Sequence, residues 1–468
     1  MNFKKKLLIT TSSLVALGAV AAVAVACSEE AQPPKLITGL KESSFYTNGK
    51  TTLEKAVTDK KIVETAKIAV FTAGGNVADK SFNQSSFEAA TLLVDQLKAA
   101  NSSGTYSVNA YNTQDAATNT LTTNYTQALN NGQNIWIASG FQHGDALKTW
   151  LGTADNKANF IKNKIIIVGV DWELDKATAD TIPGQVISLL SKTQEPGFVA
   201  GYASAKFLTE KYPEDSSKWV IGGFGGGDFL GVTDFLNGYF QGVLAWNKKT
   251  ANASKKVKWY TDDSIILNTA FATTDTTQTT INGIVNATKK PQIILPVAGP
   301  LMTQVVNAIA TANTGAYVIG VDTDQSLTNE NHASKFFTSI LKKLAFQVYQ
   351  VLVPLMAKDY ANSIFSINGA QGFSPVGETT PKNVSLTFAY AQDGVGTAKT
   401  YVTPDATAKL ATDALAAGKT EFDATLTASA DWAKIDGKTL VAGGEGSNTD
   451  TTINGATGLV WLIKEINK

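Results

Sequence analysis

The chain has 468 residues, with 40 basic and 40 acidic side chains, one cysteine and two histidines. Every basic residue is a lysine, so the bidentate guanidinium groups that read guanine bases or clamp phosphates are absent. This composition argues against nucleic-acid binding and favours a neutral or singly charged ligand.

The first 27 residues have the pattern of a bacterial lipoprotein signal peptide. Lysines at positions 4–6 form a basic region, residues 7–25 are apolar and mostly small, and Cys27 follows directly. A lone cysteine here has neither a disulfide partner nor a metal site, and lipidation is its expected use. An uncleaved membrane anchor is the alternative. Both place the protein outside the cytoplasm, and residues 28–65 are predicted to form a flexible tether.

Beyond residue 66, short apolar runs alternate with amphipathic segments, as in βαβ units around a parallel sheet. So many strands over so long a span predict an α/β protein of two lobes with a cleft between them. Strands are predicted at residues 68–71, 135–138, 165–170, 219–224, 257–260, 293–297 and 317–321, and helices at 87–99, 119–130, 196–211, 234–246, 301–312 and 338–358.

The predicted lobes divide the chain unevenly. Lobe 1 is expected to span residues 66–185, and residues 336–363 are expected to return to it. Lobe 2 is expected to span residues 186–335 and to be completed by 364–468. This last part is rich in Gly, Thr and Ala, and its apolar runs at 385–390 and 459–466 are predicted as strands.

Residues 67–90 predict a strand, a glycine turn and a helix N-terminus. Ser81 is a candidate N-cap, and Gln84 follows three residues later as in a capping box. The turn places Phe82 at the carboxyl end of a parallel strand, where open α/β sheets bind ligands. A ring at this position suits stacking on a flat ligand, and covering its own helix is the alternative interpretation.

The sequence gives little support for catalysis, a metal or a cofactor. The two histidines, His143 and His332, lie near no Gly-x-Ser-x-Gly motif, and no His/Cys cluster is present. His143 follows a predicted strand, and either a ligand contact or a plain loop position fits it. The glycine run at residues 222–231 lacks a phosphate-loop lysine. We therefore expect no catalytic residue, no metal and no cofactor.

Several polar residues or glycines follow predicted strands. Asp145, Asp171, Gly299 and Asp322 come just after apolar runs, and Lys342 lies one turn into the helix predicted to open at Thr338. A carboxylate accepts hydrogen bonds from two neighbouring hydroxyl groups, as on a ribose. Each residue singly is more often a helix cap or a solvated turn, but their position at strand ends indicates a shared ligand site.

Five segments resemble one known family, in the same order along the chain. The family is the basic membrane proteins, purine-nucleoside-binding lipoproteins that serve ABC importers as substrate receptors, and the chain is most similar to mollicute members. The D-x-S-F-N and G-V-D-x-D-Q motifs are the most specific. The segments are residues 78–89 (ADKSFNQSSFEA), 139–146 (SGFQHGDA), 226–243 (GGDFLGVTDFLNGYFQGV), 296–309 (PVAGPLMTQVVNAI) and 318–343, which contains VIGVDTDQSL and FFTSILKK.

This resemblance implies a type I periplasmic-binding-protein fold, with lobes that close on the ligand. It implies that the base stacks between Phe82 and a second ring, for which Phe271 is the first choice and Phe235 the second. The other implied ligand contacts are Asp79, Asn83 and Asp171, with Gly299 allowing close approach and Asp322 and Lys342 holding the ribose. The implied partners are an ABC permease and membrane lipid at Cys27, with the protein a monomer on the outer face of the cell membrane.

One position departs from the family pattern. The aspartate usual six residues before the D-x-S-F-N aspartate is Ala73 here, with Thr72 beside it. Base preference is therefore left open. Three other functions also stay open: a receptor for another small neutral ligand such as a sugar, a nucleosidase on the same scaffold, and an adhesin with a vestigial cleft.

Overall fold

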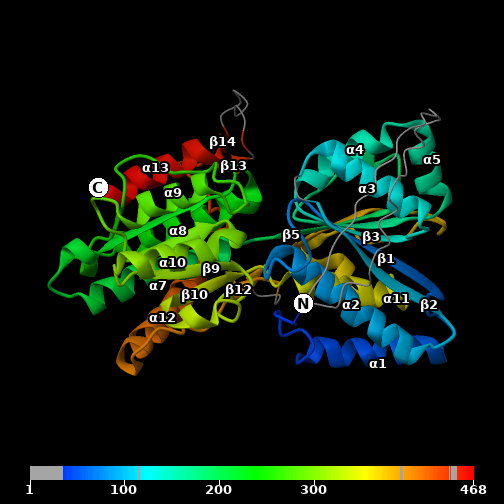
Figure 1. The fold of residues 1–468 in the computed structure, drawn as a ribbon, viewed down its shortest axis with the longest axis horizontal. Coiled ribbons are helices and arrows are strands. Elements are labelled where there is room, and N and C mark those ends of the chain that lie inside the picture. The colour runs from blue at the N-terminus through cyan, green and yellow to red at the C-terminus, as the bar shows by residue number, and fades with distance from the viewer. Residues whose placement is uncertain (1–34, 114–115, 391–393, 442, 444–450) are drawn as a thin grey trace, which may run out of the picture. The chain divides into compact units, whose positions relative to one another are not determined.

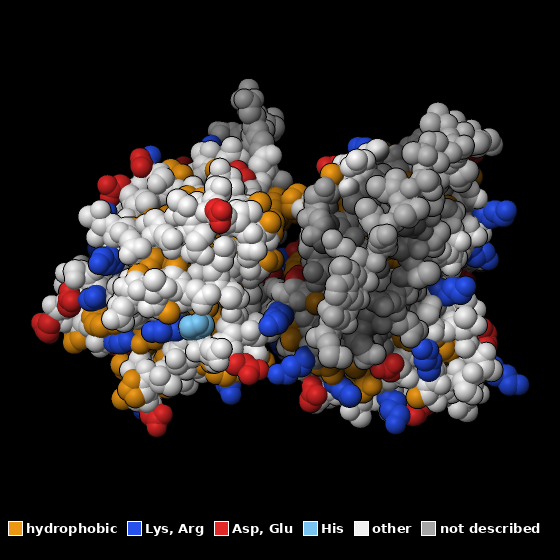
Figure 2. All heavy atoms as spheres, in the orientation of Figure 1, with side chains coloured by type: hydrophobic (Ala, Val, Ile, Leu, Met, Phe, Trp, Pro, Cys, Tyr) orange, Lys and Arg blue, Asp and Glu red, His pale blue; other side chains and the backbone are white. Residues whose placement is uncertain are grey.

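The structure is a computed structural model that describes residues 35–113, 116–390, 394–441, 443 and 451–468. The predicted signal peptide and Cys27 lie outside these residues. No helix within the described ranges combines the length and the apolar character that a membrane crossing requires. On the face drawn in Figure 2, basic and acidic side chains are interspersed, in keeping with their equal numbers.

The first lobe is built on a six-stranded sheet in which all neighbouring strands are parallel. Its central strands are buried on both faces and read as continuous apolar runs, as parallel strands covered by helices do. In order across the sheet the strands are β11 (Val384–Phe388), β5 (Val186–Ser191), β4 (Ile166–Val170), β3 (Ile135–Ser139), β1 (Thr65–Thr72) and β2 (Thr105–Tyr111).

Helices cover both faces of this sheet (Figure 1). One core contains Leu93 of α2, Leu352 of α11 and Leu53 of α1, and the other contains Tyr125 of α3 and Trp150 of α4. The helices of this lobe are α1 (Ser44–Thr58), α2 (Phe82–Ala100), α3 (Thr118–Asn130), α4 (Gln142–Leu151), α5 (Ala154–Lys162), α6 (Lys176–Ala179), α11 (Leu344–Met356) and the 3-10 segment η5 (Ser363–Gly369).

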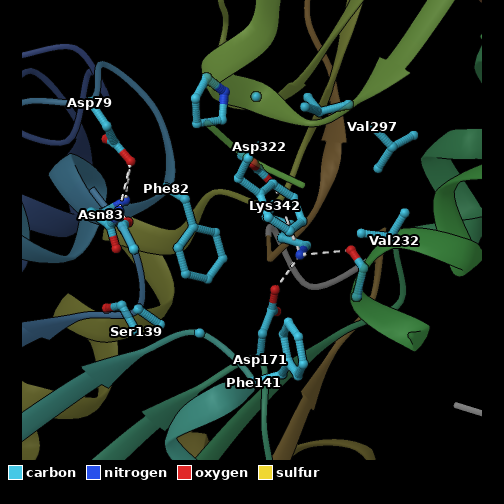
Figure 3. A pocket seen from close by; sticks show the side chains of 18 of the residues that line it. Asp79, Phe82, Asn83, Ser139, Phe141, Asp171, Val232, Val297, Asp322 and Lys342 are labelled. Atoms are coloured by element: carbon cyan, nitrogen blue, oxygen red, sulfur yellow. Dashed lines mark hydrogen bonds and ion pairs between the residues drawn. The ribbon is translucent and has the colours of Figure 1, made fainter. Parts of the chain in front are cut away.

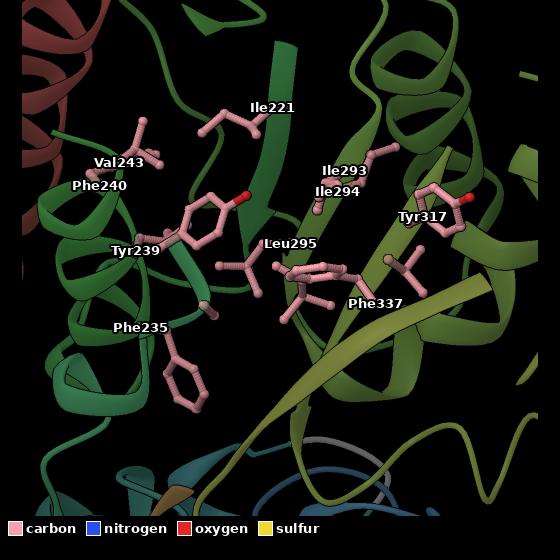
Figure 4. Packing of buried hydrophobic residues seen from close by; sticks show 14 of the residues in the cluster. Ile221, Phe235, Tyr239, Phe240, Val243, Ile293, Ile294, Leu295, Tyr317 and Phe337 are labelled. Carbon is pink, nitrogen blue, oxygen red and sulfur yellow. The ribbon is translucent and has the colours of Figure 1, made fainter. Parts of the chain in front are cut away.

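The second lobe has a sheet of the same size. Its strands are parallel except for β12, which pairs antiparallel to β10 at one edge. The order is β12 (Gly396–Thr397), β10 (Phe336–Leu341), β9 (Tyr317–Asp322), β8 (Ile293–Val297), β6 (Val220–Gly225) and β7 (Lys258–Trp259). Figure 4 shows Tyr239 and Phe240 of α8 beside Ile221 and Leu295 of the sheet, and all four side chains are buried.

The helices of the second lobe include two from the end of the chain. α12 packs on α7 and α13 packs on α8, so the last part of the chain covers helices that come before it in sequence. The elements are α7 (Gln194–Lys211), η1 (Ser216–Lys218), α8 (Leu230–Lys248), η2 (Thr250–Asn252), α9 (Asp275–Val285), η3 (Gly299–Leu301), α10 (Met302–Ala312), η4 (Glu330–Lys335), α12 (Asp405–Ala428), α13 (Gly455–Asn467) and a two-stranded sheet of β13 (Thr439–Val441) and β14 (Thr452–Asn454).

The chain passes between the two sheets three times: between β5 and α7, between β10 and α11, and between β11 and β12. The predicted lobe boundaries are therefore wrong in detail. β5, expected in lobe 2, pairs with β4 of lobe 1, and β11 likewise pairs in lobe 1. β10, expected in lobe 1, pairs with β9 of lobe 2.

The prediction of a flexible tether through residue 65 is wrong from residue 35 onward. Residues 44–58 form α1, and Leu40 and Leu53 are fully buried. The backbone amides of Ile37 and Thr38 donate to the carboxylate of Glu88 on α2, over 2.8 and 3.3 Å. This segment is fixed to lobe 1 because its apolar side chains pack in one core with α2 and α11 and its backbone amides bond to Glu88.

Two predicted elements have the wrong type. Residues 338–341, predicted as the start of a helix, lie in β10, and residues 459–466, predicted as a strand, lie in α13. Both are short apolar runs, whose periodicity does not separate a buried strand from a buried helix. The seven strands predicted between residues 68 and 321 are present, while β2 and β5 had no prediction.

Candidate functional site

A pocket lies between the two lobes. It is lined by turns that follow strands of both sheets. All eight residues that the sequence assigned to ligand binding line it: Asp79, Phe82, Asn83, Asp171, Phe271, Gly299, Asp322 and Lys342. Figure 3 labels all of them except Phe271 and Gly299.

Asp79 organises the lobe 1 wall. Its two carboxylate oxygens accept hydrogen bonds from the backbone amides of Ser81, Asn83 and Gln84 and from the Asn83 side chain, all at 2.9–3.0 Å. Burial raises the pKa of Asp79, and these bonds oppose that rise. The Ser81 side chain makes no capping bond, so the prediction of Ser81 as the N-cap side chain is wrong and Asp79 takes that role.

This capping leaves Phe82 at the start of α2, with its ring toward the centre of the pocket in Figure 3. The side-chain amide of Asn83 donates to Gly74 O at 3.1 Å as well as to Asp79. The wall is therefore held by hydrogen bonds among neighbours in sequence. Asp79 lines the pocket, but its acceptors are occupied by its own helix.

Asp171 and Asp322 occupy equivalent positions in the two lobes. Asp171 follows β4 and Asp322 ends β9, and both have left-handed backbone conformations, with φ of 67° and 66°. Residues other than glycine rarely adopt this conformation, and such strain gathers at functional sites. The left-handed conformation turns the carboxylates of Asp171 and Asp322 into the space between the sheets.

Lys342 joins these two carboxylates. It directly follows β10, at a crossing between the lobes, and not within a helix as predicted. Its ammonium group donates to Asp171 Oδ2 and to Gly231 O (3.3 Å), and lies 3.8 Å from Asp322 Oδ1. It also lies 5.4 Å and 5.1 Å from the ring centroids of Phe82 and Phe235.

The charge cluster formed by Asp171, Asp234, Asp322 and Lys342 holds more negative than positive charge. Burial raises the pKa of Asp322 to about 6 and that of Asp234, on α8, to about 7, and Lys342 moderates both. The surrounding carboxylates raise the pKa of Lys342, so it stays cationic. The carboxylates of this cluster can accept hydrogen bonds from the hydroxyl groups of a ligand, but their excess negative charge disfavours an anion. Sequence analysis missed Asp234, which lies among apolar residues of an amphipathic segment.

Besides Phe82, four phenylalanines line the pocket: Phe141, Phe229, Phe235 and Phe271. Phe141 of lobe 1 stacks on Phe229 of lobe 2, with ring centroids 3.7 Å apart and an interplanar angle of 29°. The ring centroids of Phe229 and Phe271 are 6.2 Å apart, and Phe235 also lines the pocket. The sequence analysis missed Phe141 and Phe229, although both lie in segments that carry the family resemblance. Their signal was an aromatic residue within two positions of a glycine that follows a strand.

The glycine run at residues 222–231 makes room for these rings. A Cβ on Gly226 would lie 2.4 Å from Phe271, and one on Gly227 would lie 2.7 Å from Phe229. Gly299 plays a similar part between the lobes, since a Cβ there would lie 2.7 Å from Ser81 Oγ. Gly226 and Gly227 therefore allow close packing within lobe 2, and Gly299 allows it between the lobes.

Two further candidates lie outside the pocket. His143 is fully buried in lobe 1, bonded to the Tyr125 hydroxyl at 2.6 Å, and burial lowers its pKa to about 3. The ligand-contact interpretation of His143 is therefore wrong. Asp145 is exposed in the first turn of α4. Among the described residues, no group of His, Cys, Asp and Glu has the arrangement of a metal site.

Two α/β lobes with three crossings and a pocket at the strand ends define a type I periplasmic-binding-protein fold. A solved ABC transporter solute-binding protein from Aeropyrum pernix K1 has this arrangement, with a TM-score of 0.54 and 14% identity over 79% of this chain and 90% of that one. The predicted fold class is confirmed.

The chain belongs to the family of PnrA-like ABC transporter substrate-binding proteins, whose model matches residues 66–367. It is 24% identical to the uncharacterized lipoprotein MG040 of Mycoplasma genitalium, over 54% of each chain. It is 23% identical to the homologue of that protein in Mycoplasma pneumoniae, over 43% of this chain and 40% of the relative. The chain thus spans about half the length of the curated relatives it matches. The sequence-based family assignment is confirmed.

Proposed function

We propose that the protein captures a nucleoside between its lobes and delivers it, unchanged, to an ABC permease. The observation that carries the proposal is that Phe82 of lobe 1 and Phe271 of lobe 2 line one pocket with Asp322 and Lys342. Two rings supply faces for a flat base, and an ionised carboxylate supplies acceptors for two ribose hydroxyls.

The energetics favour a ligand that uses both features. Aromatic stacking contributes about 0.5–1.5 kcal/mol per pair beyond area burial. A hydrogen bond to a charged group contributes about 1.5–3 kcal/mol. Micromolar affinity corresponds to about 8 kcal/mol, so it requires stacking, charged hydrogen bonds and closure of the lobes together. A free base lacks the hydroxyls and free ribose lacks the stacking face, so both should bind more weakly than the nucleoside.

The base preference is expected to depend on the lobe 1 turn. Ala73 lines the pocket at the position where the family resemblance places an aspartate, and it offers no hydrogen bond from its side chain. The Thr72 hydroxyl does not replace it, because that hydroxyl is buried in bonds with Gly75 and Thr113. We therefore expect weak discrimination among purines, with stacking and ribose contacts dominating.

A thermal-shift screen of residues 28–468 tests the proposal, with purine and pyrimidine nucleosides, free bases, ribose and nucleoside monophosphates as ligands. A ligand at a hundredfold excess over its dissociation constant stabilises the folded state by about 2.7 kcal/mol. We expect a shift with a nucleoside and little or none with ribose or a monophosphate, since the cluster disfavours an anion. No response to any nucleoside would refute the proposal.

We also propose that Cys27 carries lipid and holds the protein on the outer face of the membrane. The family and the two lipoprotein relatives support this assignment. Metabolic labelling with a fatty acid should label the wild-type chain, and Cys27→Ser should abolish labelling. Release of that variant into the medium would support the anchor. Labelling that survives the substitution would contradict it.

A further inference from the structure

The glycine-rich loop at residues 226–231 carries Phe229, whose ring stacks on Phe141 across the pocket. The same loop supplies Gly231 O, which accepts a hydrogen bond from Lys342. Its glycines explain how the rings fit, but not what holds the loop itself in place. The residue before Phe229 is Asp228, and Asp228 faces the last part of the chain.

Residues from the C-terminal part of the chain contact Asp228 from two directions. The backbone amide of Gly443 donates to Asp228 O at 2.8 Å, and the amide of Ala456 donates to Asp228 Oδ2 at 3.4 Å. A Cβ on Gly443 would lie 2.6 Å from Asp228 O, and one on Gly455 would lie 2.3 Å from Asp228 Oδ1. The Gly443 contact is with backbone and therefore requires glycine, whereas a side chain at position 455 would displace the Asp228 carboxylate.

Ala456 lies in the first turn of α13, so Asp228 places a carboxylate at the N-terminus of that helix. A negative charge there is favourable because the first amides of a helix have no partner within it. Asn454 caps the same helix from within, by accepting from the amide of Thr457 at 2.7 Å. Asp228 Oδ1 is buried and makes no hydrogen bond with the described residues.

We propose that Asp228 is a positioning residue, through which α13 holds Phe229 in its stack with Phe141. The C-terminal part of the chain, which lies outside the family match at residues 66–367, would thereby control how firmly the cleft closes. The role of Asp228 in holding the loop depends only on these contacts. The consequence for a ligand rests on the proposed nucleoside-binding function.

Hydrogen exchange of the ligand-free protein tests the first part. The amides of Val232 and Thr233 both donate to Phe229 O, at 2.8 and 2.9 Å, and they report on the loop. Asp228→Ala should speed their exchange by about tenfold, and Asp228→Asn by less, since an amide oxygen still accepts from Ala456. Asn454→Ala is the matched comparison: it removes a cap from the same helix but keeps the contacts of Asp228, so it should speed exchange of these amides by less than Asp228→Ala. Equal exchange in Asp228→Ala and Asn454→Ala would overturn the proposal.

Nucleoside dissociation rates test the second part. Phe229→Ala and Asp228→Ala should each speed dissociation, the latter about threefold to tenfold, and the double variant should be no faster than Phe229→Ala alone. Additive effects would show that Asp228 does not act through Phe229 and would overturn the proposal. If the wild-type protein binds no nucleoside, the proposed function fails, while the exchange experiment still decides the role of Asp228.

Discussion

The two walls of the pocket differ in how they are built. The lobe 1 wall follows directly from β1, and Asp79 holds it by hydrogen bonds to residues within a few positions in sequence. The lobe 2 wall gathers separate segments that contribute Phe229, Phe271, Gly299 and Asp322. α13 contacts Asp228, the residue before Phe229. A locally held wall tolerates change elsewhere in the chain, whereas an assembled wall depends on contacts far from the ligand.

Lys342 is where the two walls meet, and its loss should have the largest effect. Lys342→Met leaves Asp171 and Asp322 buried without a cation, and should lower the free energy of unfolding by about 3–5 kcal/mol. Urea denaturation at neutral pH measures this. Adding Asp171→Asn should restore part of the loss.

Lys50→Met is the control for that experiment. Lys50 pairs with Glu54 on an exposed face of α1, and its loss should cost less than about 1 kcal/mol. A similar small effect for Lys342→Met would mean that the cluster carries no net charge in the folded protein.

The two rings test whether both walls contribute equally to the ligand. Phe82→Ala and Phe271→Ala should each lower nucleoside affinity by about tenfold to a hundredfold, because each removes one stacking face. Isothermal titration calorimetry measures this, with Phe82→Tyr and Phe271→Tyr as ring-preserving controls. If Phe271→Ala binds like the wild type while Phe235→Ala does not, Phe235 is the second ring.

The charge cluster should make binding depend on pH. Only ionised Asp322 accepts two hydroxyls, and its pKa of about 6 means that about a tenth is ionised at pH 5 and nearly all at pH 7.5. Affinity should therefore rise about tenfold over this range. Asp322→Asn should bind weakly with no such rise, and Asp234→Asn, outside the pocket lining, should keep it. Affinity that is constant from pH 5 to 7.5 would exclude Asp322 as the acceptor.

Gly299 tests the contact between the walls, with the smallest effect. A Cβ on Gly299 would lie 2.7 Å from Ser81 Oγ, so Gly299→Ala should hold the lobes slightly apart and lower affinity about threefold to tenfold. Ser81→Ala removes the clashing oxygen, so the double variant Ser81→Ala/Gly299→Ala should recover most of the loss. Failure to recover would place the effect within lobe 2.

Local sequence patterns predicted the βαβ arrangement, the two lobes and the residues that carry the family motifs. Apolar strands buried on both faces leave a strong local signal, and polar residues such as Asp171 and Asp322 follow them within a residue or two. The same local signal predicted the strand, turn and helix around Phe82. It failed for short apolar runs such as residues 338–341, where strand and helix look alike.

Which segments share a sheet and which residues share the pocket depend on contacts in three dimensions. β5 lies in lobe 1 because it pairs with β4, and β11 because it pairs with β5 far earlier in the chain; composition encodes neither pairing. The stack of Phe141 on Phe229 and the contact of Asp228 with α13 depend on how closely glycines let separate elements approach. Such contacts arise from packing in three dimensions, so local sequence patterns could not reveal them.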